Sequence, residues 1–143
     1  MTDMLRPLAR YADFAGRARR REFWLYSLFL WAMLFLLMYT DAALNLGGTA
    51  ESYSEVSEDG VSIGFNMTGG ILTLIFFLAT LLPSIAVSVR RLHDVGRSGL
   101  TFLFVLIPLF GWLYLLFLYT QPGQPGPNRY GPDPKAGAAG LSI

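Results

Sequence analysis

Three long stretches of this chain contain no Asp, Glu, Lys or Arg. They are Phe23–Thr40, Val61–Val89 and Ser98–Asn128. A mostly apolar run of about 18 or more residues is long enough for a helix to cross the hydrocarbon core of a bilayer. The composition agrees, because 53% of the 143 residues are hydrophobic and only 15% are charged, against about 25% in a soluble domain. The sequence therefore predicts an all-α integral membrane protein with three transmembrane helices.

The charges between these stretches alternate in sign. Arginines precede the first stretch and also separate the second from the third, whereas the gap between the first and second holds Asp and Glu but no Lys or Arg. Basic segments stay on the cytoplasmic side of a membrane. We therefore expect a cytoplasmic N-terminus and an acidic loop on the outside.

These boundaries define a single membrane domain, 1–143. Its expected parts are a basic cytoplasmic segment (1–21), a first span (22–44), an acidic outer loop (45–68), a second span (69–89), a basic cytoplasmic loop (90–98), a third span (99–120) and a Pro/Gly-rich tail (121–143). The N-terminal segment has two readings, an amphipathic helix along the interface or a disordered basic tail. Residues Val61–Phe65 of the outer loop alternate like a short strand, but an isolated strand is marginally stable in water, so we expect a flexible loop.

The third stretch is interrupted in its middle by Pro108 and Gly111. Each half alone is too short to cross, since eight helical residues rise only about 12 Å. A single kinked span would put the tail outside, whereas a re-entrant hairpin would return it to the cytoplasm. Irregular backbone at membrane depth must be buried in protein, and two other spans offer little cover, so the sequence favours the single span.

Small hydroxylated residues recur on one face of the second span, at steps of 7, 4 and 4: Thr73, Thr80, Ser84 and Ser88. Such residues let helices approach closely and bond across the contact. We interpret this stripe as a helix-packing face. The alternative is a hydrated cleft that leads to Arg91.

Three short polar motifs flank the apolar stretches. They are Phe14-x-Gly16-Arg17-x-x-Arg20-x-Glu22-Phe23-Trp24, then Arg90-Arg91-Leu92-His93-Asp94-x-Gly96-x-Ser98-Gly99, and Asn128-x-Tyr130-Gly131-x-Asp133-Pro134. In this order the chain resembles the small bacterial inner-membrane proteins catalogued as domain of unknown function 805. The resemblance implies a multi-pass protein of the inner membrane and supplies no activity. Leu100 departs from the family pattern, where Trp is common, and the outer loop looks longer than in compact relatives.

The second motif is the best candidate site. Arg90 and Asp94 stand four residues apart and could pair along a helix face, and His93 could carry protons or sense pH. The structural interpretation is a polar cap that joins two helix ends, with Glu22 paired to Arg90 or Arg91. The third motif has the composition of a tight turn.

Three function classes follow. The leading one is a binding or scaffold protein that acts through these cytoplasmic motifs, with anionic lipids, a membrane-protein partner or a second copy as its partner. Guanidinium groups bind lipid phosphates well. The alternatives are a small transporter or channel subunit and a lipid head-group enzyme. A proton-coupled transporter is disfavoured because no ionisable residue lies within a predicted span.

The sequence predicts no catalytic residue, metal site or cofactor, and no nucleic-acid partner. With no Cys and one His, disulfides, thiolate catalysis and Cys/His zinc sites are excluded.

Overall fold

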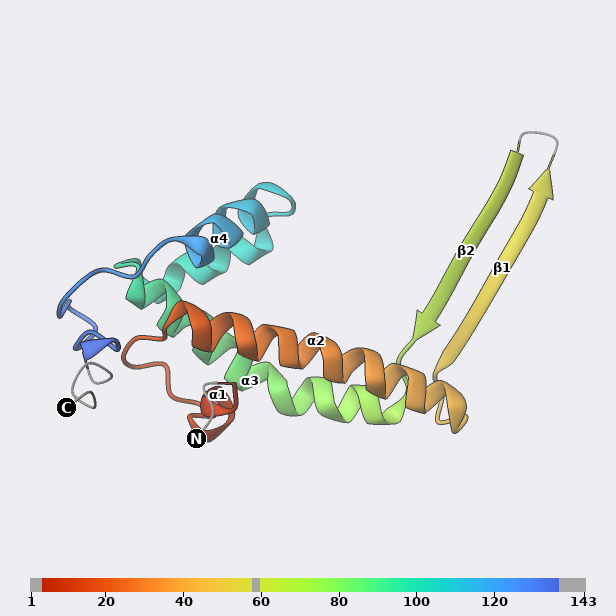
Figure 1. Ribbon diagram of the computed structural model, residues 1–143, viewed down its shortest axis with the longest axis horizontal. Coiled ribbons are helices and arrows are strands. Elements are labelled where there is room, and N and C mark those ends of the chain that lie inside the picture. Colours follow the sequence, from red (N-terminus) through yellow and green to blue (C-terminus); the bar gives the residue numbers. More distant parts are fainter. Residues whose placement is uncertain (1–3, 58–59, 137–143) are drawn as a thin grey trace, which may run out of the picture. The chain divides into compact units, whose positions relative to one another are not determined.

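The computed structural model describes residues 4–57 and 60–136. By its contacts the chain divides into two compact units, Met1–Ser27 with Leu81–Ile143, and Leu28–Thr80. Figure 1 shows its helices and paired strands. In chain order the elements are α1 (Arg6–Ala9), α2 (Arg20–Ala43), β1 (Thr49–Ser57), β2 (Gly60–Thr68), α3 (Ile71–Asp94), the 3₁₀ helix η1 (Gly99–Leu106) and α4 (Phe110–Thr120).

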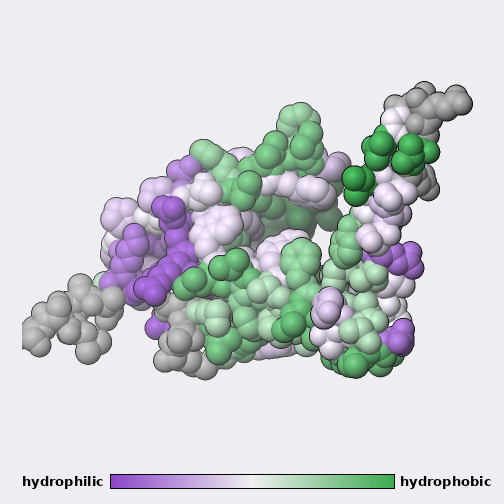
Figure 2. All heavy atoms as spheres, turned by 45° about the vertical axis from the view of Figure 1, so that its right-hand side comes forward, coloured by the Kyte–Doolittle hydropathy of each residue, from purple (hydrophilic) through white to green (hydrophobic). Residues whose placement is uncertain are grey.

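The two long helices α2 and α3 are apolar enough to cross a membrane. Each has 24 residues and contains an 18-residue stretch of high mean hydropathy, 1.7 in α2 and 2.3 in α3. At 1.5 Å per residue each rises about 36 Å, which exceeds the ~30 Å of a hydrocarbon core. Their apolar side chains lie mostly on the surface, as with Leu28 (67% exposed) and Trp31 (63%), and Figure 2 shows broad hydrophobic areas. Hydrocarbon suits such surfaces better than water does.

Helix α3 extends beyond the predicted second span and takes in the second motif. It ends in a Schellman turn, where the Arg97 N–H reaches the Leu92 carbonyl at 2.9 Å and Gly96 has φ +76°. A glycine adopts this left-handed conformation without the steric cost that a side chain brings. Arg90, Arg91 and Asp94 therefore lie in the last turns of a helix rather than in a loop.

The expectations of an all-α fold and a flexible outer loop are wrong, because this loop forms an antiparallel hairpin of β1 and β2. Nine residue pairs run from Thr49↔Thr68 to Ser57↔Gly60. Apolar β-formers such as Val56, Ile63 and Phe65 share one side of the ladder, so the alternation seen near Phe65 extends across both strands.

The expected single span over 99–120 is also wrong, because η1 and α4 fold back on each other. Trp112 Nε1 donates to the Val105 carbonyl at 2.8 Å. A Cβ at Gly111 would lie 1.9 Å from the Phe104 carbonyl oxygen, so only glycine permits this approach. Pro108 lacks the N–H needed to continue a helix, and Leu109 turns the chain with φ +60°. Each arm rises only about 16 Å, which is half a membrane.

The first unit has a small apolar core of Leu92, Leu115 and Leu118. Among the residues that the structure describes, the same unit buries five charged side chains. They are Arg17, Glu22, Arg90, Arg91 and Asp94. We call these residues the polar cluster.

Candidate functional site: a buried polar cluster at the end of α3

All members of the polar cluster are nearly inaccessible, with Arg90 and Arg91 at 0% exposure, Asp94 at 2%, Glu22 at 4% and Arg17 at 5%. A buried charge is costly unless it is paired and hydrogen-bonded. The cluster therefore requires an account of where each charge finds its partner.

Asp94 bridges two arginines from different parts of the chain. Arg17 Nε donates to Asp94 Oδ1 at 2.9 Å, and Arg91 Nη1 donates to Asp94 Oδ2. Arg17 and Asp94 are 77 residues apart, so this carboxylate joins the N-terminal segment to the end of α3. Each of its oxygens accepts from a guanidinium, which is the stronger, charge-assisted kind of hydrogen bond.

The remaining donors of these two arginines bind main-chain carbonyls. Arg91 reaches the carbonyls of Ala18, Tyr119 and Gln121. Arg17 reaches those of Gln124 and Gly126. The carbonyls of Tyr119 and Gln121 lie at the C-terminal end of α4, where helix carbonyls lack partners within the helix and carry partial negative charge. The arginines thus hold the end of α4 and the start of the tail beside the end of α3.

Arg90 binds the start of α2. Its Nη1 donates to Glu22 Oε1 at 3.2 Å, and its carbonyl accepts from the Ala18 N–H at 3.0 Å. The predicted pairing of Glu22 with one of the two arginines is confirmed. The predicted pairing of Arg90 with Asp94 is wrong, because Arg91 and Arg17 occupy that carboxylate. Arg90 Nε and Nη2 are buried without a hydrogen-bond partner in the described part of the chain.

His93 joins the N-terminal segment to the third motif. Its Nδ1 lies 3.2 Å from the Gly16 carbonyl, and its ring stacks on Tyr130 with centroids 3.8 Å apart. The Asn128 side-chain amide donates to the His93 carbonyl at 3.0 Å. Gly16 itself has φ +82°, a conformation that favours glycine. The imidazole therefore has contacts that fix its position.

The third motif forms the predicted tight turn. Asn128 and Gly131 exchange main-chain hydrogen bonds at 3.0 Å, and Asn128 Oδ1 accepts from the Tyr130 N–H. Asp133 accepts from the N–H groups of Lys135 and Gly126. The hydrogen bond from the Lys135 N–H holds the pKa of Asp133 below its ordinary value of 3.8, and the hydrogen bond from the Gly126 N–H adds a smaller lowering.

Three further motif residues, Ser98, Arg20 and Trp24, also lie outside the polar cluster. Ser98 caps η1 by accepting from the Leu100 N–H at 3.3 Å. Arg20 is exposed at the first position of α2, and Trp24 is 39% exposed beside Phe23. These residues shape the surface around the cluster.

The hydroxyl stripe of α3 divides between the two units. In the first unit, the Ser84 hydroxyl lies 3.5 Å from the Tyr26 hydroxyl on α2, whereas Ser88 donates back to the Ser84 carbonyl. In the second unit, Thr80 donates to the Phe76 carbonyl of its own helix. Two members, Thr73 and Ser84, thus make hydrogen bonds to α2.

The second unit holds a polar site that sequence reasoning missed. Asp41, fully buried, accepts from the N–H groups of Gly70, Leu72 and Thr73 and from the Thr73 hydroxyl, at 2.7 to 3.0 Å. A carboxylate here satisfies the free N–H groups at the start of α3 and complements the helix dipole. We call this the Asp41 cap. Asp41 lies within α2. The expectation that no ionisable residue lies within a membrane-crossing helix is therefore wrong.

Signals for these missed partners exist in the sequence. Gly69-Gly70 before a long apolar run marks a helix start that has no capping side chain of its own. The Gly/Pro-rich tail leaves carbonyls free to accept from arginine. Gly123 lets the tail approach Asp94 closely, because a Cβ there would lie 2.0 Å from Asp94 Oδ2.

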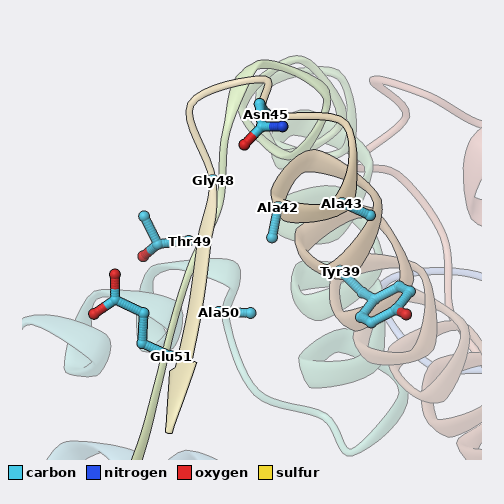
Figure 3. Close-up of a pocket in the computed structure, with 8 residues that line it drawn as sticks. All are labelled: Tyr39, Ala42, Ala43, Asn45, Gly48, Thr49, Ala50 and Glu51. Carbon is cyan, nitrogen blue, oxygen red and sulfur yellow. The ribbon is translucent and has the colours of Figure 1, made fainter.

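A hollow of about 390 Å³ lies between the last turns of α2 and the start of β1, within the second unit (Figure 3). Tyr39, Ala42 and Ala50 contribute to its lining, and Glu51 is its one charged residue. Across residues 4–57 and 60–136, no three His, Asp or Glu side chains gather closely enough to hold a metal ion.

Comparison with known proteins identifies the family to which this chain belongs. The family model described as protein of unknown function DUF805 matches residues 11–132. The chain belongs to this family. Inner membrane protein YhaH of Escherichia coli K12 is 39% identical over 133 residues, covering 92% of this chain and 94% of the relative. Inner membrane protein YhaI of the same strain is 34% identical over 131 residues, covering 92% and 93%. No solved structure matches the chain.

The resemblance read from the three motifs is thereby confirmed, and the matched range includes the first two motifs and the third as far as Gly131. The chain is a small protein of the bacterial inner membrane, and α2 and α3 fit as its membrane-crossing helices. The family itself has no established activity.

Proposed function

We propose that this protein is an inner-membrane binding protein of the scaffold type, with its polar cluster on the cytoplasmic side. The observation that carries the proposal is how the cluster uses its hydrogen bonds. Arg17 and Arg91 bind Asp94 and the carbonyls of four other segments, namely Ala18, the end of α4, Gln124 and Gly126. Such bonding holds a surface in one shape, which is what a binding platform requires.

The proposed orientation of the protein in the membrane is inferred from the positions of its arginines. The N-terminal segment and residues 90–97 carry the basic residues, and the positive-inside rule assigns such segments to the cytoplasm. Because Arg91 also holds Tyr119 and Gln121, the tail lies on that same side. The η1–α4 hairpin then enters the membrane from the cytoplasm and returns to it.

The proposed partner of the platform is the phosphate of anionic lipids in the inner leaflet. The cluster holds three guanidinium groups against two carboxylates, so a positive charge is left over. Arg20, Arg97 and Arg129 are exposed and add charge to the same unit. Guanidinium groups bind phosphate with two parallel hydrogen bonds, and the cytoplasmic leaflet is negatively charged.

The test is lipid retention in mild detergent and thermal stability in nanodiscs with or without phosphatidylglycerol. The native chain should retain phosphatidylglycerol and unfold at a higher temperature when it is present. The triple variant Arg20→Gln, Arg97→Gln, Arg129→Gln should lose most of both effects.

The matched control is Lys135→Gln, which removes an exposed charge from the tail. It should leave retention close to that of the native chain. If the triple variant retains as much phosphatidylglycerol as the control does, anionic lipid is not the partner.

A further inference from the structure

The β1–β2 hairpin has two faces of opposite character. Because paired residues of an antiparallel ladder lie on the same face, the register assigns each side chain. One face, the polar face, carries Thr49, Glu51, Tyr53, Ser62, Gly64, Asn66 and Thr68. The other, the apolar face, carries Ser52, Ser54, Val56, Val61, Ile63 and Phe65 beyond its root at Ala50 and Met67.

Side-chain contacts agree with this assignment. The hydroxyls of Thr49 and Thr68 lie 2.8 Å apart on the polar face. A Cβ at Gly64 would lie 2.2 Å from the Tyr53 ring, so this ring covers its paired glycine. Figure 3 shows Thr49 and Glu51 on one side of β1 and Ala50 on the other.

The apolar face is open. Val56 is 81% exposed, Val61 66%, Ile63 82% and Phe65 65%, and no residue of this face is charged. An isolated two-stranded hairpin is marginally stable in water, and strands usually need a further layer on their hydrophobic side. A contiguous exposed apolar patch marks an interaction site.

The shape of the apolar face suits a copy of itself. β1 contributes the small Ser52 and Ser54, while β2 contributes the large Ile63 and Phe65 directly opposite them. The face is therefore a ridge beside a trough. A two-fold axis parallel to the strands places the ridge of one copy over the trough of the other. Packed sheets interdigitate in this way, and a two-fold contact joins the same patch on both subunits.

We propose that the apolar face of the hairpin packs against the same face of a second copy of this chain, forming a four-stranded sandwich. Charge is compatible with this contact, because two uncharged faces meet without like-charge repulsion while Glu51 stays on the outer, polar side.

The size of the contact fits a membrane dimer. Strands of nine residues span about 30 Å, and two of them are about 10 Å wide. Two faces thus bury roughly 600 Å², below the ~1,200 Å² of stable complexes between free proteins. Two copies anchored in one bilayer with the same orientation meet at a high effective concentration, so a small contact suffices.

The chain has no cysteine, so single thiols can probe each face. Ser54→Cys places a thiol on the apolar face, and Ser62→Cys is the matched control on the polar face. Native membranes carrying either variant are treated with a bismaleimide whose reach matches the ~10 Å spacing of packed sheets. Ser54→Cys should give several-fold more cross-linked dimer than Ser62→Cys.

A second substitution sharpens the test. Ile63→Asp in the Ser54→Cys chain should lower the dimer yield to that of Ser62→Cys, because it buries a carboxylate in the contact. Asn66→Asp, on the polar face, should not lower it. Equal yields from the two single-Cys chains would overturn the proposal even if Ile63→Asp disrupts the hairpin.

The bilayer surface is the competing occupant. A bimane label at Ser54→Cys would then be quenched by brominated lipid while the cross-linked yield stays low, and that result would also overturn the proposal. Supporting results are a high Ser54→Cys yield and no quenching. None of these outcomes depends on the lipid binding proposed for the polar cluster.

Discussion

The polar cluster and the Asp41 cap both bury ionised groups at the ends of apolar helices, but they neutralise them differently. In the cluster, Asp94 is offset by two guanidinium groups. At the cap, Asp41 is offset by three main-chain N–H groups and one hydroxyl. Formal charges join segments far apart in the sequence, whereas backbone dipoles hold one helix start against its neighbour.

The difference predicts different consequences of breaking each site. Loss of one charge in the cluster leaves other charges buried without a counter-ion. Loss of the Asp41 carboxylate leaves only N–H groups to be satisfied by water at a helix end. Substitutions in the polar cluster should therefore lower the stability of its whole unit. Loss of the Asp41 cap should instead increase local opening at the start of α3.

The largest expected effect is that of Asp94→Asn. It leaves Arg17 and Arg91 buried with no carboxylate, and removing one partner of a buried ion pair costs about 3–5 kcal/mol. Chemical unfolding in detergent would measure the loss. The control is Asp13→Asn, at a pair that is about 40% exposed, where a change of less than about 1 kcal/mol is expected. Equal losses in the two variants would contradict the assigned role of Asp94.

Next is the coupling of Glu22 and Arg90. Each of Glu22→Gln and Arg90→Gln should destabilise the protein, and the double variant should lose less than their sum by about 1–3 kcal/mol, because the partners are in contact. Glu22→Gln combined with Arg91→Gln, which lacks this direct contact, should be closer to additive. Additivity in both cycles would show that the Arg90–Glu22 pair is not energetically coupled.

A smaller and local effect is expected at the Asp41 cap. Asp41→Ala removes four acceptor contacts, so the amides of residues 70–73 should exchange with deuterium faster while amides of the polar cluster keep their protection. Thr73→Val removes one of the four and should give a lesser increase. Hydrogen-exchange mass spectrometry measures both, and equal acceleration throughout the chain would contradict a local role.

The smallest effect concerns pH at Asp133. Its pKa lies below 3.8 in the folded chain, so the ionised carboxylate stabilises the turn of the tail. This contribution is complete above the ordinary pKa and is lost as the pH falls through the lowered value. The protection of the Gly126 and Lys135 amides, after correction for the pH dependence of intrinsic exchange, should therefore fall in acid. Asp133→Asn should exchange faster at neutral pH and lose this acid dependence.

The sequence motifs indicated which residues form the polar cluster more reliably than they indicated which of those residues pair. Gly96 ends α3 and Ser98 caps η1, because capping is local chemistry within a few residues. Helical spacing allows Arg90 to pair with Asp94, yet Arg90 binds Glu22, the other partner that the sequence offers. Spacing identifies neighbours on one helix but carries no information on residues far away in the sequence. Arg17, which is 77 residues from Asp94, binds one oxygen of the Asp94 carboxylate.

The predictions for residues 45–68 and 99–120 are wrong for a related reason. Strand propensity near Phe65 was present, but its partner strand is polar and gives little signal by itself. Pro108 and Gly111 indicated an interruption, and both a kink and a hairpin satisfy that signal. The choice was made by Gly111, which lets α4 approach the Phe104 carbonyl, and by the hold of Arg91 on the end of α4.

The sequence by itself determined the environment of this protein, its two long apolar helices and the motifs of its family, because hydropathy, charge asymmetry and capping act over short distances along the chain. Only the tertiary structure decided which arginine meets which carboxylate, that Asp41 caps α3, and that residues 99–120 turn back. Those outcomes depend on which groups compete for the same partner in three dimensions, and a buried charge accepts whichever geometry pairs it most completely.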